Sequence, residues 1–350
     1  MNLDGFSIWL LAVIFIVGGV AIWISGIYLS NTVDALSKRL GLGQALGGMI
    51  LLAIVTNLPE IAITVSASLQ HNIELAVGNI LGGIAMQTLV LVALDVFGVG
   101  KKASLTYKAA SMELVLEGLL VIFVLTFVVI GHQLPSSLVF LRMSPSVLLI
   151  FVAWITGLLL INKARKGLPW QVKNSASDDE QNKNNKNEKK DAHKRSTGAN
   201  VAIFLITALI TLVAGYALER SGDAIAKKIG MQGILFGATI LAAATSLPEI
   251  STGLASLKLK AYTLAVSDIF GGNAFLPVLF LVAALVSGQA ILPRAHKSDL
   301  YLTGLAMLLT SVYVWGMIFK PKKQFLGMGI DSFIVLILYL IGIAGLFAVG

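Results

Sequence analysis

Long apolar segments alternate with short polar ones along almost the whole chain. Ten apolar segments approach the length of about 20 residues that a helix needs to cross roughly 30 Å of hydrocarbon. They begin at Phe6, Gln44, Leu75, Ser111, Ser146, Val201, Gly233, Ala261, Leu300 and Gly329. We therefore predict an all-α membrane protein with ten transmembrane helices.

Composition supports this class. Of the 350 residues, 57% are hydrophobic and 13% are charged, whereas soluble domains carry about 25% charged residues. The chain has no cysteine, which excludes disulfides and thiolate metal sites. Its four histidines fall in predicted loops, so no zinc site is expected within the spans. No resident cofactor is expected.

The positive charges sort by loop, which indicates how the chain is oriented. The net charge of +8 is compatible with an acidic partner such as nucleic acid, but its distribution favours another explanation. With the N-terminus outside, 20 of the 26 lysines and arginines face the cytoplasm, as the positive-inside rule requires. We predict an integral protein of the inner or plasma membrane with both termini outside. The lipid bilayer is its environment, and neither nucleic acid nor an obligate protein partner is expected.

One polar segment interrupts the apolar pattern near the middle of the chain. Residues 162–200 are rich in Asn, Lys, Asp and Ser, a composition that cannot bury a core. We predict a disordered cytoplasmic linker, with binding to anionic lipid as the lesser alternative. It separates two parts with five predicted helices each, residues 1–161 and 201–350.

The two parts repeat each other at a constant offset of 189 positions. Residues 34–60 and 223–249 are identical at 12 of 27 positions without a gap, ending in T-N-L-P-E and T-S-L-P-E. The offset still holds where Gly78-Asn79 aligns with Ser267-Asp268. Because each part has an odd number of spans, the second must enter the membrane from the opposite side. Inverted repeats with matching proline-interrupted helices are typical of secondary transporters, whose substrates bind near the midplane.

Each repeat places a carboxylate directly after its proline. Glu60 and Glu249 need partners, because an isolated carboxylate in a bilayer costs at least about 2.5 kcal/mol, and no basic residue lies at comparable depth in the same helices. The prolines are expected to free backbone carbonyls around 53–56 and 242–245. Hard cations such as calcium take six to eight oxygens. Further oxygens are available on Thr56, Thr245, Ser246 and Asn57.

Asn79 and Asp268 occupy equivalent positions in the third helix of each repeat, each followed by paired glycines. Close packing of small residues explains the glycines alone, but packing does not require a polar group at the matching place in both repeats. We therefore include both residues in the predicted site.

These motifs resemble a known family. The segments Thr56 to Glu60 with Gly78 to Gly82, and Ala244 to Glu249 with Ser267 to Asn273, are similar to the two signature repeats of the sodium/calcium exchanger family, part of the calcium/cation antiporter superfamily. The resemblance implies exchange of calcium for sodium by alternating access. It also implies that Glu60 and Glu249 are the central calcium ligands, which also bind sodium, with Asn79 and Asp268 beside them.

Some positions depart from the family pattern. Leu75 and Leu264 stand where sodium-coupled members place serine ligands, and Asn57 replaces a serine. The resemblance then implies weaker accessory sodium sites. The alternative is an antiporter that exchanges calcium, or another divalent cation, for protons taken up by Glu60, Glu249 or Asp268.

Two other classes fit less well. A channel would need a filter of carbonyls or a ring of charges, and no such motif is evident. A membrane-embedded enzyme or an ATP-driven pump would need its own residues, and no phosphate-binding loop of the G-x-x-x-x-G-K-[ST] type is present. We predict a transporter and not an enzyme.

Overall fold

The computed structural model describes residues 3, 5–39, 53–100, 103–135, 143–166, 196–258, 260–294 and 296–349. Within these ranges, nine helical segments are long and apolar enough to cross a membrane, and a shorter apolar helix spans Leu58–Leu69. The span predicted from Gln44 begins outside the described residues, and this shorter helix is its described part. The prediction of an all-α membrane fold is confirmed.

The first half contains α1 (Ile8–Arg39), α3 (Leu58–Leu69), α4 (Ile73–Leu94), the π-helical turn η2 (Asp95–Val99), α5 (Leu105–Ala109), α6 (Met112–Gln133) and α7 (Pro145–Lys166). The second half contains α10 (Thr197–Ile229), α11 (Gly233–Phe236), η3 (Gly237–Leu241), α12 (Ala242–Thr245), α13 (Leu247–Lys258), α14 (Tyr262–Phe275), η4 (Leu276–Val278), α15 (Leu279–Ser287), η5 (Leu292–Arg294), α16 (Lys297–Phe319) and α17 (Ile330–Val349). A small antiparallel hairpin joins β1 (Gln324–Phe325) and β2 (Met328–Gly329).

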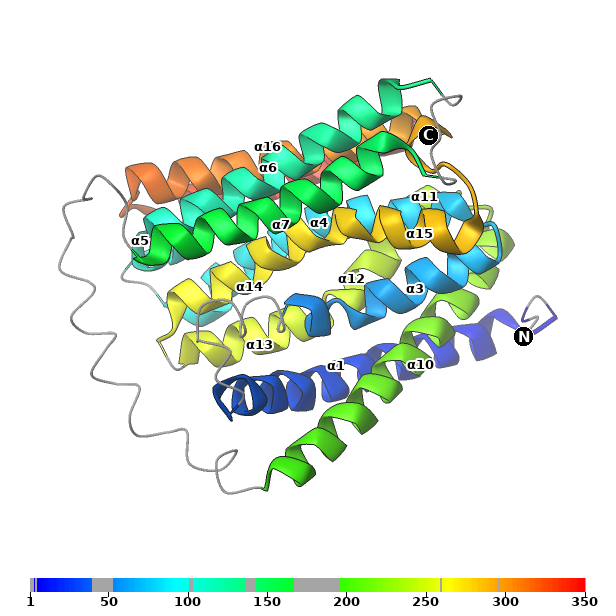
Figure 1. Ribbon diagram of the computed structural model, residues 1–350, viewed down its shortest axis with the longest axis horizontal. Coiled ribbons are helices and arrows are strands. Elements are labelled where there is room, and N and C mark those ends of the chain that lie inside the picture. The colour runs from blue at the N-terminus through cyan, green and yellow to red at the C-terminus, as the bar shows by residue number, and fades with distance from the viewer. Residues whose placement is uncertain are drawn as a thin grey trace.

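The helices run roughly side by side between two ends of the molecule. The first turn of α1 and the last turn of α17 lie at one end, while α7 ends and α10 begins at the other (Figure 1). Residues 167–195, most of the predicted linker, lie outside the described residues. The division at 162–200 therefore stays a prediction.

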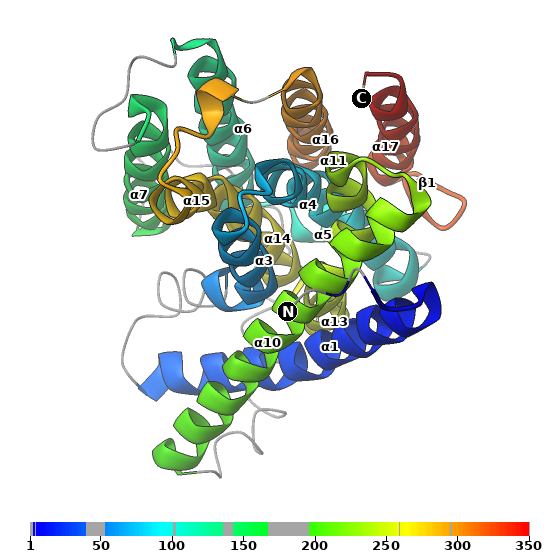
Figure 2. The same cartoon turned by 90° about the vertical axis from the view of Figure 1, so that its right-hand side faces the viewer.

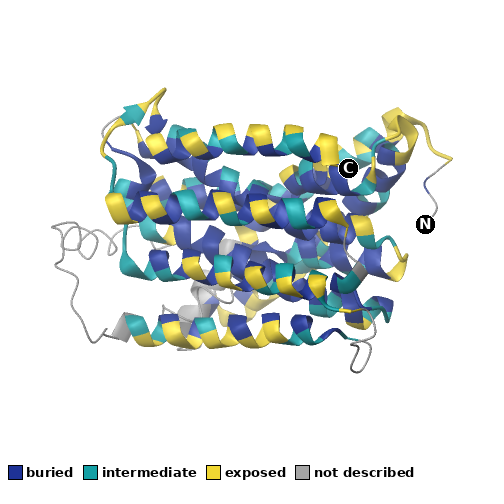
Figure 3. Ribbon diagram, turned by 90° about the horizontal axis from the view of Figure 1, so that it is seen from above, coloured by how far each residue is buried: buried dark blue, intermediate teal, exposed yellow. Residues whose placement is uncertain are grey.

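Burial separates central helices from peripheral ones. The segments Ile73–Val99 and Tyr262–Ser287 bury 72% and 78% of their most apolar window, against 33% for Ile8–Leu29 and 28% for Thr197–Ile229. In Figure 2 α4 lies at the centre of the bundle, and Figure 3 shows exposed residues in stripes along the outer helices. Large apolar side chains such as Trp9 and Trp315 are 80% and 63% exposed. Such surfaces fit contact with lipid.

The helices α1 and α10 pack on each other and on the opposite repeat in matching ways. A Cβ on Gly26 of α1 would lie 2.8 Å from the Cβ of Pro248, and one on Gly215 of α10 would lie 3.1 Å from the carbonyl oxygen of Pro59. These residues are equivalent at the offset of 189, since 26 aligns with 215 and 59 with 248. The contacts thus follow the inverted repeat and bring α1 and α10 against the proline breaks.

Candidate cation site

The proline motifs break both helices where the sequence predicts. Asn57 separates a helical turn at 53–56 from α3, and Ser246 separates α12 from α13. Their backbone angles, φ −88° and ψ 15° for Asn57 and φ −80° and ψ 2° for Ser246, leave the helical range. Glu60 and Glu249 therefore lie in the first turns of α3 and α13, where the helix dipole favours negative charge.

Three carboxylates are buried near these breaks. Glu60, Glu249 and Asp268 are all at most 5% exposed, and Glu249 lies near the other two. Neither oxygen of Glu60 makes a hydrogen bond of normal geometry, although the side chains of Thr245 and Gln87 lie beside it. One oxygen of Glu249 and one of Asp268 also lack a partner. The residues described here thus present unpaired negative charge to one region.

Asn79 and Asp268 differ in how they are held. The Thr252 hydroxyl donates a 2.9 Å hydrogen bond to Asp268 Oδ2, whereas neither side-chain atom of the fully buried Asn79 has a partner. The residue equivalent to Thr252 in the first repeat is Ile63, which cannot donate. Each of the two side chains nevertheless keeps an oxygen that can coordinate a cation.

The hydroxyls at the breaks donate to nearby carbonyls. Thr245 and Ser246 donate hydrogen bonds of 3.2 and 2.8 Å to the carbonyl of Ala242, and Thr56 donates one of 3.4 Å to the carbonyl of Ala53. Since the hydrogens of Thr245 and Ser246 are directed to a carbonyl, the lone pairs of these two oxygens can face a cation. The expectation that all carbonyls at 53–56 and 242–245 are free was wrong for Ala53 and Ala242, because polar side chains reach back to them.

Gln87 is a polar residue of the site that the sequence motifs missed. Its amide nitrogen donates to Asn57 Oδ1 at 3.0 Å and to Glu249 Oε1 at 3.3 Å, so it joins both halves. Its amide oxygen is buried without a partner. The equivalent position in the second repeat is Leu276, so the two repeats have no matching polar pair at this position. The contact also engages the oxygen of Asn57, which must release Gln87 before it can bind an ion.

Glycines allow the backbones to meet around these groups. A Cβ on Gly272 would lie 2.9 Å from Asn57 Nδ2 and 3.1 Å from Gln87 Oε1, and one on Gly78 would lie 2.9 Å from the carbonyl oxygen of Ile234. The second contact joins α4 to α11, just before the π-helical turn η3. Turns of this kind are frequent at functional sites.

The two leucines at expected sodium-ligand positions have different surroundings. Leu75 is fully buried and packs in an apolar cluster with Ile22 and Ile63. Leu264 is 49% exposed. Only Leu75 therefore fills a closed apolar space.

Acidic groups alone do not complete a metal site. Among the described residues, no three side chains of His, Asp or Glu are placed to hold a metal ion by themselves. A hard cation here would need the neutral oxygens as well, consistent with the six to eight ligands that calcium prefers.

An inverted repeat with buried carboxylates at paired helix breaks defines a membrane-embedded ion antiporter. The sequence profile described as sodium/calcium exchanger protein matches residues 10–161 and 199–345. The chain therefore belongs to the sodium/calcium exchanger family, as its motifs predict, and is an integral membrane protein.

Relatives and solved structures agree with this assignment. The chain is 27% identical over 305 residues to the inner membrane protein YrbG of Escherichia coli, covering 86% of this chain and 88% of YrbG. The solved sodium-calcium exchanger NCX_Mj matches with a TM-score of 0.62 and 16% identity, covering 97% of this chain and 99% of that one. The H+/Ca2+ exchanger CAX matches with 0.64 and 13%, covering 96% and 82%. At these identities the structures show the fold alone, and they confirm two inverted five-helix repeats.

Proposed function

We propose that this protein exchanges calcium for sodium across a membrane by alternating access, with Glu60 and Glu249 as the central ligands. One observation carries the proposal: two repeat-related carboxylates are buried at helix breaks, and in the described structure no basic side chain pairs with either. Burial of unpaired charge is costly. A divalent cation offsets it while it is bound.

The ligands are the three carboxylates and the neutral oxygens around them. A cation of charge +2 relieves the repulsion that Glu249 experiences from Glu60 and Asp268, and calcium accepts mixed carboxylate, hydroxyl and carbonyl ligands in a flexible geometry. The proposed set is Glu60, Glu249, Thr56, Thr245, Asn79, Asp268, Asn57 and Ser246. Calcium and sodium are cargo in this proposal.

Protons are the second candidate for the coupling ion. Leu75 fills a closed apolar space where sodium-coupled relatives offer a hydroxyl, and the three buried carboxylates offer places for protons when calcium leaves. The name of NCX_Mj refers to sodium and that of CAX to protons, and similar folds do not distinguish between them.

The proposed orientation follows from charge and geometry together. The first turn of α1 and the last turn of α17 lie at the same end of the molecule, while α7 ends and α10 begins at the other (Figure 1), and the positive-inside rule assigns the lysine-rich sequence between α7 and α10 to the cytoplasm. The linker then faces the cytoplasm.

Reconstitution tests both the cargo and the coupling ion. Proteoliposomes loaded with calcium should lose it under an imposed sodium gradient, and a proton gradient is compared in the same preparation. Vesicles with Glu60→Gln protein are the matched control. Flux with a proton gradient alone would establish the second candidate. Calcium flux that needs neither gradient and carries current would contradict exchange.

A further inference from the structure

A second group of buried carboxylates lies where α4 ends and α17 begins. Asp95 and Asp331 are at most 4% exposed, and an oxygen of each lies beside Gly329. Asp95 lies eight residues beyond Gln87, which is roughly 12 Å along a helix. This group is therefore separate from the candidate cation site.

Asp95 accepts three hydrogen bonds. It accepts hydrogen bonds of 2.7 Å from the backbone N–H groups of Leu105 and Gly329 and from the hydroxyl of Ser332. Asp95 thus joins the end of α4 to α5 and to the β hairpin.

Asp331 has no equivalent set of donors. Both of its oxygens are buried without a hydrogen-bond partner. Beside it lie N–H groups of its own helix turn and the hydroxyl of Thr106. Two glycines make room for this carboxylate, because a Cβ on Gly316 or Gly329 would overlap it. The packing therefore leaves a defined space for the Asp331 carboxylate, but no hydrogen-bond donor in the described part of the chain balances its charge.

The nearby hydroxyl hydrogens are already committed elsewhere. Ser332 donates to Asp95, so Tyr313 must be the donor in its 3.2 Å contact with Ser332. Ser104 donates to the carbonyl of Pro321, so Thr106 must be the donor in its 3.2 Å contact with Ser104. Each hydroxyl has one hydrogen. The oxygens of Thr106 and Tyr313 consequently keep lone pairs that can bind a cation.

We propose that Asp331 and Asp95, with the oxygens of Thr106 and Tyr313, form a second site for a hard divalent cation that is bound and not transported. Oxygen acceptors without spare donors are the ligands that calcium and magnesium require. The bound cation links the first turn of α17 to the end of α4. Its position gives it a structural role at the end of the helix that carries Asn79.

Binding measured without transport tests this site separately from the exchange mechanism. The full-length chain carrying Glu60→Gln and Glu249→Gln is purified, and radioactive calcium is measured by equilibrium dialysis up to about 10 mM, well above the millimolar constants of weak sites. We expect about one calcium ion per chain. Adding Asp331→Asn should abolish it, whereas adding Glu113→Gln, a carboxylate on another helix, should not.

A milder variant protects the test against misfolding. Thr106→Val keeps the shape of the side chain and removes one oxygen, and it should raise the dissociation constant about tenfold. Calcium should also raise the unfolding temperature of the parent but not of Asp331→Asn. Equal calcium binding by the parent and by a monodisperse Asp331→Asn protein, or no binding by the parent, would overturn the proposal whether or not the chain transports calcium.

Discussion

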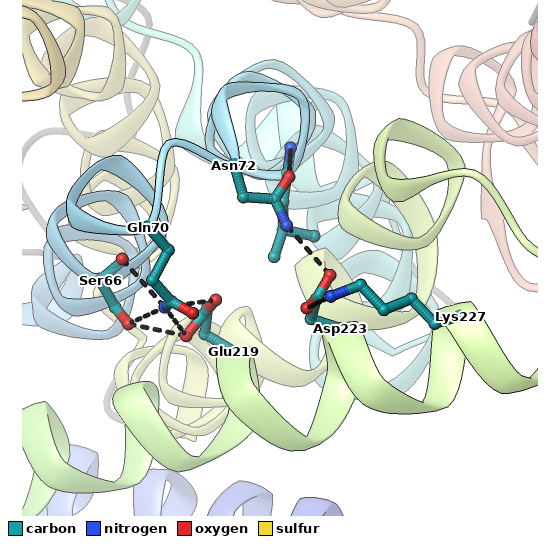
Figure 4. A network of polar contacts seen from close by, with 7 residues as sticks. Ser66, Gln70, Asn72, Glu219, Asp223 and Lys227 are labelled. Carbon is teal, nitrogen blue, oxygen red and sulfur yellow. Dashed lines mark hydrogen bonds and ion pairs between the residues drawn. The ribbon is translucent and has the colours of Figure 1, made fainter. Parts of the chain in front are cut away.

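The interface between α3 and α10 and its repeat-related counterpart between α13 and α1 share a backbone contact but not a polar one. Both place a glycine of the long helix against the proline break of the other repeat. Only the first adds a buried network (Figure 4), in which Glu219 accepts hydrogen bonds from Ser66 at 2.7 Å and from Gln70 at 3.2 Å.

The residues at the equivalent positions explain why the second interface lacks this network. The positions equivalent to Ser66 and Glu219 are Ala255 and Ser30. A second contact, from Asn72 to Asp223 at 3.0 Å, has no counterpart either, since Ala261 aligns with Asn72. Duplication preserved the contact that positions the helix break, while the polar contacts diverged. The two interfaces therefore differ in the energy needed to separate them, and we expect the two access states to differ in stability.

The largest effect is expected where the repeats still agree. Glu60→Gln and Glu249→Gln should each lower calcium transport below about one tenth of wild type, because a neutral amide cannot offset the dehydration of a divalent ion. Uptake into proteoliposomes at matched protein amounts measures this. A variant that retains more would show that the two carboxylates are not equivalent ligands.

The next effect concerns the interface that differs. Ser66→Ala with Glu219→Ser gives α3 and α10 the residues of the other repeat. With the proposed orientation this network closes the outer end, so its loss should lower the outer KM for calcium about tenfold relative to the inner KM, since a hydrogen bond to a charged group contributes about 1.5 to 3 kcal/mol.

Vesicles of both orientations give the two KM values. Thr207→Ala is the matched control, because this hydroxyl bonds to the backbone of its own helix. An unchanged ratio of outer to inner KM would mean that the network does not distinguish the two access states.

A smaller effect is expected from Gln87, the polar residue of the site that has no polar counterpart in the second repeat. Gln87→Leu introduces the residue found at the equivalent position 276 and removes both the hydrogen bond to Glu249 and a buried amide oxygen that has no partner. We expect calcium affinity to fall about five- to tenfold, the cost of one polar contact. Met86→Leu, a volume-conserving change next to it, should leave affinity unaltered. Isothermal titration calorimetry on the purified proteins compares the calcium affinity of the wild type, Gln87→Leu and Met86→Leu.

The smallest effect should separate the two leucines. Leu75→Ser places a hydroxyl in a closed space near Asn79 and should lower the sodium concentration for half-maximal exchange a few-fold, at some loss of stability from the cavity. Leu264→Ser should do little, because Leu264 is half exposed. Sodium titrations of calcium efflux test the pair, and equal responses would show that exposure does not decide the outcome.

The sequence predicts most of the architecture because the relevant signals are local or repeated. Apolar runs mark the spans, and proline marks the breaks at Asn57 and Ser246, since it lacks an N–H wherever it lies. The placement of Glu60 and Glu249 in the first turns after the breaks follows from the same motif.

The sequence could not predict contacts that arise once. Gln87 and Glu219 belong to no motif and have apolar or shorter residues at the equivalent positions, so their roles depend on how the halves meet. The carbonyls of Ala53 and Ala242 were expected to be free, but the side chains of Asn57 and Ser246 satisfy them. Asp331 belongs to no motif either, and only the packing shows that its oxygens are buried.

The lengths of α1 and α10 make the protein sensitive to its bilayer. At 32 and 33 residues they measure about 48 Å, well beyond the roughly 30 Å of hydrocarbon, and they lie obliquely across the other helices (Figure 2). Such helices adjust to membrane thickness by tilting. Because α1 contacts one proline break and α10 the other, we expect a thinner or thicker membrane to change the angle at which they cross the candidate cation site. Lipid chain length should then alter the rate of exchange.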